Sequence, residues 1–223
     1  MNVHRFDFAG APLCALPTGA LWLPNERALV VSDLHLGKSE RMARRGGVML
    51  PPYETSDTMA RLDTLIAQYD PRTVVCLGDS FDDVEAAVAV SQQIADWISR
   101  LQAGRRWIWI EGNHDAGSAE FGGTHVGAMS IGPLTFRHIA DPDCKNEVSG
   151  HFHPKARLTV RGKTISRPCF VVDSTRIILP AFGLYTGGLD CRDAPIAGLM
   201  GPNACAILTG PTARAIPMPR HAA

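Results

Sequence analysis

The chain lacks an excess of charge of either sign. Its 22 Lys and Arg residues balance 22 Asp and Glu residues over 223 residues. A protein that binds duplex nucleic acid mainly through phosphate contacts usually carries a basic excess or a basic stripe, so any such binding must be local here. The balance does not exclude a substrate that contains a phosphodiester, because bound divalent cations, rather than basic side chains, could then be the main positive charges beside the phosphate.

The sequence also lacks paired cysteine motifs and long apolar runs. Its six cysteines are scattered without a Cys-x-x-Cys pair, so we expect reduced thiols rather than a disulfide framework. No stretch approaches the roughly 18 apolar residues of a membrane-spanning helix. The first residues have no continuous apolar core of the kind that a signal peptide needs. We therefore expect a soluble, cytoplasmic protein.

Length and composition predict a single domain over residues 1–223. The chain is 45% apolar and 20% charged, with no biased segment and no internal repeat, which is typical of an ordinary globular domain. From Pro211 onward the sequence mixes Pro, Arg and Ala without a pattern, and we expect this end to be frayed.

Three short apolar runs indicate buried central strands. They span residues 28–32, 73–77 and 107–110 and are rich in β-branched or aromatic side chains. Between them, apolar residues recur at helical spacing in residues 59–69 and 84–101. This alternation of strand and helix predicts a right-handed parallel unit.

Closely spaced strands follow from about Leu134. Apolar runs at residues 134–137, 156–160, 169–172 and 176–179 are separated by Gly, Pro or Asp-Ser turns. We expect these strands to form a second sheet packed on the first. The predicted fold class is α/β, a four-layer αββα sandwich of two mixed β-sheets flanked by helices.

Polar residues gather in five short segments, three of which directly follow the predicted central strands. The segments are Asp33-Leu34-His35, Gly78-Asp79-Ser80-Phe81-Asp82, Gly112-Asn113-His114-Asp115, the single His138 and Gly150-His151-Phe152-His153. In a parallel sheet, ligands collect outside the carboxyl ends of the strands. Two divalent cations about 3.5–4 Å apart can hold the attacking and leaving oxygens of a displacement at phosphorus. The segments supply enough ligands for two metals and one further histidine as an acid.

Several of these residues suit a metal by their own chemistry. Asp79 has two oxygens that could bridge two cations, and Gly78 permits a close approach of the backbone. Asn113 offers a neutral amide oxygen that suits a hard dication. His151 and His153 would point the same way in an extended segment, so one imidazole could bind each metal.

Each of these residues also has a plain structural reading. Asp33 and His35 could be a satisfied strand-end aspartate and a core histidine, Asn113 a turn residue, and His138 a histidine that is only hydrogen-bonded. Asp82 or Asp83 stands just ahead of a helical pattern, where an N-cap or a supporting contact to a ligand is expected.

The five segments, in this order, resemble the calcineurin-like metallophosphoesterase superfamily. Its pattern is Asp-x-His, Gly-Asp-x-x-Asp, Gly-Asn-His-Asp/Glu, His and Gly-His-x-His, and every block is intact here. The resemblance implies that Asp33 and His35 bind the first metal and that His138 binds the second. It also implies that His114 faces the substrate and protonates the leaving oxygen. Asp115 could orient His114.

Segments around these motifs resemble the bacterial ligase-associated DNA damage response endonucleases called PdeM. They are residues 19–24, 29–38, 150–154, 179–183 and 186–188. The resemblance implies a DNA substrate and a functional association with DNA ligase and helicase repair proteins. Nothing in the ligand pattern itself selects DNA.

Basic residues follow two of the ligand segments. Lys38, Arg41, Arg44 and Arg45 could hold a substrate phosphate beside the metals, or they could form a solvated helix face. A second basic group nearly alternates along the chain, as on one exposed face of antiparallel strands: Lys155, Arg157, Arg161, Lys163 and Arg167.

The leading hypothesis is a dinuclear metal-dependent phosphodiesterase in which a metal-bridging hydroxide attacks phosphorus, with DNA as a candidate substrate and DNA repair as its setting. Two alternatives stay open: a hydrolase of a small nucleotide or lipid-linked phosphoester, and a non-enzymatic scaffold with the same fold. The cofactors we expect are two divalent metal ions, with manganese preferred and iron or zinc also compatible with Asp, Asn and His ligands.

Overall fold

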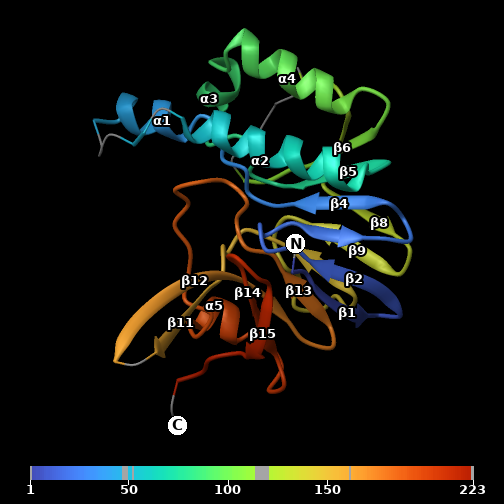
Figure 1. Cartoon of the computed structure of the whole chain (residues 1–223), viewed down its shortest axis with the longest axis vertical. Coiled ribbons are helices and arrows are strands. Elements are labelled where there is room, and N and C mark those ends of the chain that lie inside the picture. Colours follow the sequence, from blue (N-terminus) through green and yellow to red (C-terminus); the bar gives the residue numbers. More distant parts are fainter. Residues whose placement is uncertain (1, 47–49, 52, 114–120, 161, 222–223) are drawn as a thin grey trace.

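Two mixed β-sheets lie face to face at the centre of the computed structural model (Figure 1). The structure describes residues 2–46, 50–51, 53–113, 121–160 and 162–221. Within these residues, one sheet has seven strands and the other has eight. Side chains from both sheets, among them Val75, Ile108, Phe136 and Phe170, form one buried apolar cluster between them.

The first sheet contains the three central strands that the sequence predicts. Its order along the sheet is β1 (His4–Phe8), β2 (Ala11–Ala15), β3 (Leu21–Leu23), β4 (Ala28–Val31), β5 (Thr73–Leu77), β6 (Arg106–Ile110) and β7 (Thr124–Val126). Strands β4 to β7 run parallel, and β1 to β4 pair antiparallel. The parallel strands are covered on both faces, which is why β4, β5 and β6 are almost continuously apolar.

Helices cover the outer face of the first sheet (Figure 1). Helix α2 (Glu54–Tyr69) and helix α4 (Gln92–Gln102) pack their apolar faces on it, and the short helices α1 (Lys38–Arg44) and α3 (Val84–Val88) lie beside them. The expected helical pattern over residues 84–101 is two helices rather than one. Ser91 caps α4 by accepting a hydrogen bond from the Ile94 N–H, so a new helix begins there.

The second sheet carries the four later strands that the sequence predicts, together with others that it does not. Its order is β15 (Arg214–Pro217), β14 (Cys205–Leu208), β12 (Lys163–Val172), β13 (Arg176–Ile178), β10 (Glu147–Ser149), β9 (Leu134–Arg137) and β8 (Ala128–Ile131), and β11 (Lys155–Val160) pairs with β12. Strand β10 runs parallel to β9 and β13. Helix α5 (Ala194–Ala197) and the loops around it cover the outer face. The predicted layered α/β sandwich is thus confirmed, with a thin fourth layer.

The expectation of a frayed carboxyl end is wrong for most of that segment. Strand β15 pairs antiparallel with β14, and the Met218 N–H donates to the Ala204 carbonyl at 3.0 Å. Ala213 and Met218 are buried. This end is therefore ordered by its pairing with β14, which lies close by in the sequence.

Five strand ends meet where the two sheets adjoin. The predicted ligand segments come directly after β4, β5, β6, β9 and β10, so the fold delivers side chains from both sheets to one place. In the part of the chain that the structure describes, no helix has the length and apolar character that crossing a membrane requires.

Candidate metal centre

Six of the seven predicted metal ligands lie in two tight groups. The first group is Asp33, His35 and His153, and the second group is Asp79, His138 and His151. Within each group, one ligand atom from every residue lies within 4.8 Å of the others. Each group therefore combines one carboxylate with two imidazoles, and each draws on both sheets.

The backbone is left-handed at five of these six residues. Asp33, His35, Asp79, His151 and His153 have φ angles between 45° and 68°. Residues other than glycine seldom adopt this conformation, and when they do they tend to cluster at functional sites. Residues 151–153 are therefore not extended, the condition under which both histidines would point the same way. The left-handed turns instead send one of these histidines to each group.

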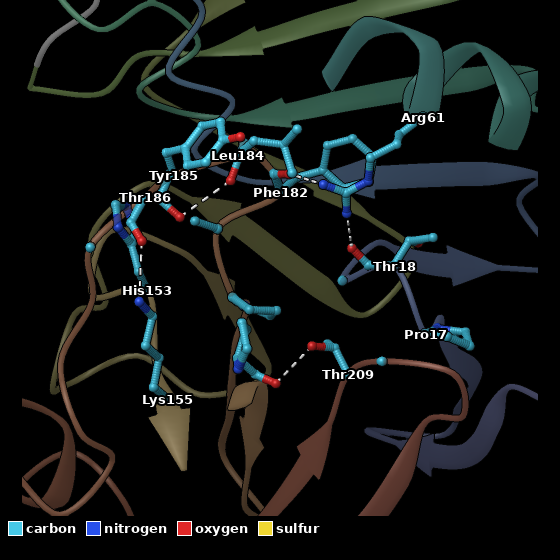
Figure 2. Close-up of a pocket in the computed structure, with 17 residues that line it drawn as sticks. Pro17, Thr18, Arg61, His153, Lys155, Phe182, Leu184, Tyr185, Thr186 and Thr209 are labelled. Atoms are coloured by element: carbon cyan, nitrogen blue, oxygen red, sulfur yellow. Dashed lines mark hydrogen bonds between the residues drawn. The ribbon is translucent and has the colours of Figure 1, made fainter. Parts of the chain in front are cut away.

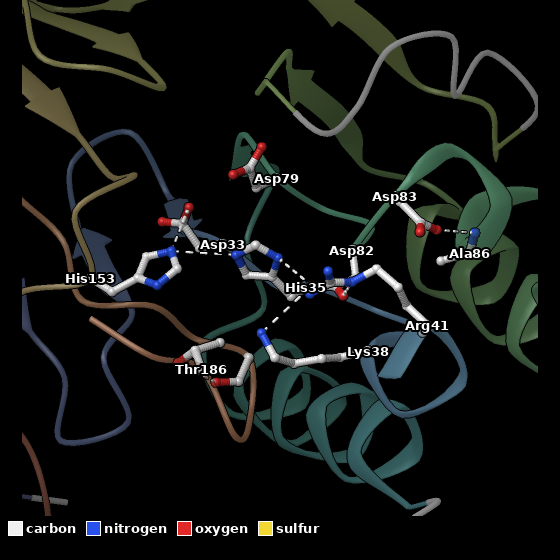
Figure 3. Close-up of polar contacts among 12 residues, drawn as sticks. Asp33, His35, Lys38, Arg41, Asp79, Asp82, Asp83, Ala86, His153 and Thr186 are labelled. Carbon is white, nitrogen blue, oxygen red and sulfur yellow. Dashed lines mark hydrogen bonds and ion pairs between the residues drawn. The ribbon is translucent and has the colours of Figure 1, made fainter. Parts of the chain in front are cut away.

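The first group centres on a buried carboxylate. Oδ2 of Asp33 accepts hydrogen bonds from the Ser32 hydroxyl and from the His151 N–H, the latter at 3.0 Å. Within the described residues, no hydrogen bond reaches Oδ1 of Asp33, which lies 3.1 Å from Nε2 of His153. Nε2 of His35 is 3.4 Å from the same nitrogen of His153 (Figure 3). Three acceptor atoms thus converge where a cation fits.

The second group contains a histidine whose tautomer is fixed by the backbone. Nδ1 of His138 lies 3.1 Å from the Leu77 carbonyl oxygen, which can only accept a hydrogen bond. In the neutral ring Nδ1 therefore carries the proton, and Nε2 offers a lone pair. That Nε2 atom lies 3.0 Å from Oδ1 of Asn113, 3.2 Å from Nδ1 of His151 and 3.3 Å from Oδ2 of Asp79. Asn113, the seventh predicted ligand, thus reaches the second group.

Electrostatics at the second group favours a bound cation. Burial alone would lower the pKa of His138, but the carboxylates of Asp79 and Asp33 outweigh it and raise that pKa. Burial lowers the pKa of His151, and the neighbouring His138 lowers it further. A negative field that attracts a proton to His138 also attracts a metal ion, and the residues present fit a divalent cation.

The two groups adjoin each other. Oδ1 of Asp33 in the first group lies 3.9 Å from Nδ1 of His138 in the second. The hydrogen bond from the His151 N–H to Asp33 is a second link between them. Two cations bound here would be neighbours rather than separate sites.

The glycines of the motifs are needed because other side chains fill their space. A Cβ on Gly78 would stand 2.1 Å from Nδ1 of His138, and one on Gly112 would stand 2.2 Å from Oδ1 of Asp79. A Cβ on Gly150 would stand 1.8 Å from the Ser32 hydroxyl. Because Gly78 has no side chain, the ring of His138 can lie close to its backbone.

Asp82 supports the first group from behind, and Asp83 caps a helix. Oδ1 of Asp82 lies 2.9 Å from Nδ1 of His35, which leaves Nε2 of that ring to face the group (Figure 3). Burial would raise the pKa of Asp82, but its hydrogen bonds with His35 and Arg41 hold it well below its usual range. The Asp83 carboxylate accepts from the Ala86 N–H at 2.7 Å. Both roles expected for this pair are therefore present, one on each residue.

The basic residues of α1 are paired with carboxylates. Arg41 bonds to Asp82, whose Oδ1 also lies 3.6 Å from Nζ of Lys38. Arg44 pairs with Asp83 at 2.9 Å. Only 15% of the Lys38 side chain and 20% of the Arg41 side chain are exposed, so these two do not form a solvated helix face. Their role in holding a substrate phosphate stays a prediction.

Two predicted residues fall outside the described part of the chain. His114 and Asp115 belong to residues 114–120, for which the structure gives no placement. Ser32, in contrast, is a supporting residue that the sequence reading missed. Its fully buried hydroxyl holds the Asp33 carboxylate, and only the neighbouring position in the chain could have suggested this.

Comparison with known proteins agrees with this geometry. The family model described as calcineurin-like phosphoesterase matches residues 26–169. The crystal structure of the Pseudomonas putida nuclease MPE is similar, with 28% sequence identity and a TM-score of 0.73 over 97% of this chain and 100% of that chain. A phosphoesterase from E. coli, Yfce, shares 14% identity over 73% of this chain and 83% of that one, and its TM-score of 0.40 supports no argument.

No curated protein matches this chain significantly in sequence. The family match nevertheless covers more than half of the chain and includes the ligand segments from Asp33 to His153. The chain therefore belongs to the calcineurin-like phosphoesterase family and is a metal-dependent phosphoesterase.

Proposed function

We propose that the chain is a dinuclear metal-dependent phosphodiesterase that acts as a nuclease. The observation that carries the proposal is the contact between the two ligand groups, in which Asp33 lies 3.9 Å from His138 and accepts a hydrogen bond from His151. Two cations held by these adjoining groups would lie close enough to hold the attacking and leaving oxygens of an in-line displacement at phosphorus.

Some residues of the site would bind metal, and others would orient the metal ligands. Asp33, His35 and His153 would bind one cation, and Asp79, Asn113, His138 and His151 the other, with Asp79 proposed as the bridge. Asp82 and the Leu77 carbonyl fix the ring orientations of His35 and His138. When bound, the two cations would polarise the phosphoryl oxygens and supply the nucleophilic water. We propose manganese as the metal, because oxygen and imidazole ligands without thiolate suit it.

His114 is our proposed general acid. It directly follows Asn113 in the sequence, and Asn113 reaches the second group. A histidine beside the bound phosphate can stabilise the developing charge and protonate the leaving oxygen, and Asp115 could orient it. Both roles rest on the sequence pattern.

Nucleic acid is our proposed substrate class. Support comes from the full-length similarity to the Pseudomonas putida nuclease MPE and from the PdeM-like segments around the ligand motifs. The same segments support a place in DNA repair alongside ligase and helicase proteins. The six cysteines form no disulfide, which suits a reducing cytoplasm.

One alternative keeps specific support. A neutral net charge suits a small nucleotide or other small phosphoester as well as it suits DNA. The non-enzymatic scaffold is no longer supported, because the chain belongs to an enzyme family and keeps both ligand groups.

Removing one charge from the proposed bridge tests the dinuclear assignment. Asp79→Asn should lower the metal content and remove most of the activity, because a neutral amide holds two cations less well than a carboxylate. Element analysis of the purified protein measures the metal directly. Asp143→Asn, an exposed carboxylate on a loop of the second sheet, is the matched control and should change neither quantity. Two metals and normal turnover in Asp79→Asn would contradict the assignment.

A second substitution separates the acid from the ligands. His114→Ala should leave the metal content near normal and lower kcat by about 10²–10⁴, the usual contribution of a positioned general acid. Metal analysis and steady-state kinetics on the same preparation distinguish the two roles. Loss of metal would instead make His114 a ligand.

A substrate panel tests the proposed chemistry. The protein should hydrolyse bis(p-nitrophenyl) phosphate and cut single-stranded or nicked DNA, and both activities should vanish with EDTA and return with manganese. Monoesters should be poorer substrates. If no divalent metal supports DNA cleavage while the small diester is hydrolysed, the small-phosphoester alternative takes the place of the nuclease.

A further inference from the structure

A cavity of about 320 Å³ opens beside the first ligand group (Figure 2). His153 forms part of its wall, and the rest comes from the segment around Phe182 to Gly187, the turn around Thr18 and the start of β11. Its volume is within the range of cavities that bind small molecules. A ligand in this cavity would lie against His153, a residue of the first ligand group.

The cavity is basic. Lys155 and Arg61 line it, and its described lining includes no Asp or Glu. Nζ of Lys155 donates to the Thr186 carbonyl at 3.1 Å, which uses one of the three hydrogens of an ammonium group. Among the described residues, Lys155 makes no ion pair, whereas Lys38 and Arg41 are held by Asp82. The ammonium group of Lys155 thus has two donors left for a ligand.

Arg61 shapes the cavity from α2. Its guanidinium donates to the carbonyls of Phe182 and Thr18 at 3.1 and 2.9 Å, and it stacks 4.6 Å from the centre of the Phe182 ring. These contacts tie the helix to both cavity walls and add a second positive charge. Its donors already have backbone partners, so we assign it to positioning rather than to ligand binding.

An exposed aromatic ring lies at the cavity's edge. About half of Tyr185 is exposed, and its φ of 55° is a conformation that a non-glycine residue seldom adopts. The segment before it is tied to the metal centre, since the Gly183 N–H donates to the Asp33 carbonyl at 3.1 Å. A Cβ on Gly183 would stand 2.1 Å from the Leu34 carbonyl oxygen, so the approach is close. The backbone two residues before Tyr185 is therefore fixed relative to the first group.

We propose that this cavity binds the nucleotide next to the scissile phosphodiester, with Lys155 on the flanking phosphate and Tyr185 stacked on the adjoining base. The inference rests on the proposed phosphodiesterase function and names its substrate as single-stranded nucleic acid. The bases of a duplex are already stacked on each other, whereas unpaired bases are free to stack on an aromatic side chain. Lys155 is two residues from His153, so their Cα atoms are at most about 7 Å apart, within reach of neighbouring phosphates.

Removing the charge of Lys155 tests its proposed contact with the flanking phosphate. For Lys155→Ala, the ratio of kcat/KM on a single-stranded oligonucleotide to kcat/KM on bis(p-nitrophenyl) phosphate should fall at least about tenfold, as expected for a lost charged hydrogen bond. The plot of log kcat/KM for the oligonucleotide against log salt should become shallower by about 0.7, the value for one phosphate contact to a single strand. Lys155→Arg should restore both.

The matched control is Lys145→Ala. Lys145 is exposed and lies just before β10, at the end of that strand opposite to His151. This variant should leave the ratio and the salt slope as they are in the unmodified protein. Metal content is measured for every variant, so that a damaged metal centre is recognised separately.

Tyr185 is tested by a second pair of variants. Tyr185→Ala should raise KM for the oligonucleotide about tenfold, whereas Tyr185→Phe, which keeps the ring, should stay near the unmodified protein. An unchanged kcat/KM for bis(p-nitrophenyl) phosphate, which contains no nucleotide, shows that the substitution has not disturbed the segment from Phe182 to Gly187.

Three results would overturn the inference. Equal losses on both substrates with an unchanged salt slope would give Lys155 only a structural role through Thr186. Hydrolysis of the small diester without cleavage of the oligonucleotide by the unmodified protein would exclude this nucleotide subsite and leave the phosphodiesterase intact. Failure on both substrates with every divalent metal would reject the proposed function itself.

Discussion

The site depends on the hydrogen bond that the buried carboxylate of Asp33 accepts from the His151 N–H. Asp33 follows β4 of the first sheet, and His151 follows β10 of the second. Nearby, the Phe182 N–H donates to the Ser32 carbonyl and the Gly150 N–H to the His138 carbonyl, so both sheets and the cavity loop are joined at this point. One carboxylate oxygen of Asp33 accepts from the Ser32 hydroxyl and the His151 N–H, and the other faces His153.

Five of the predicted ligands adopt a left-handed backbone where the strand ends converge. Each such residue costs on the order of 1–3 kcal/mol, so the surrounding structure must hold them in place. Buried apolar strands below, the glycines that admit His138 and Asp79, and the outer contact of Asp82 with His35 supply that restraint. The resulting centre concentrates negative charge and imidazole lone pairs, which a divalent cation would stabilise.

The sequence predicted the features that depend on local pattern. Strands β4, β5 and β6 could be read because parallel strands buried on both faces are continuously apolar. The order of the ligand segments pointed to the family. The sequence did not reveal β15, because its residues carry no alternating pattern, or the break before Ser91, because apolar residues recur at helical spacing on both sides of it. That Lys155 makes no ion pair among the described residues depends on which distant segments surround it, so the sequence could not show it.

The central claim is that two adjoining ligand groups hold two metal ions. A crystal structure of the manganese-loaded protein, with anomalous scattering recorded at the manganese edge, tests it most directly. The account predicts two anomalous peaks about 3.5–4 Å apart. One should be bound by Asp33, His35 and His153 and the other by Asn113, His138 and His151, with Asp79 between them. A single peak, or two peaks that do not share a ligand, would contradict it.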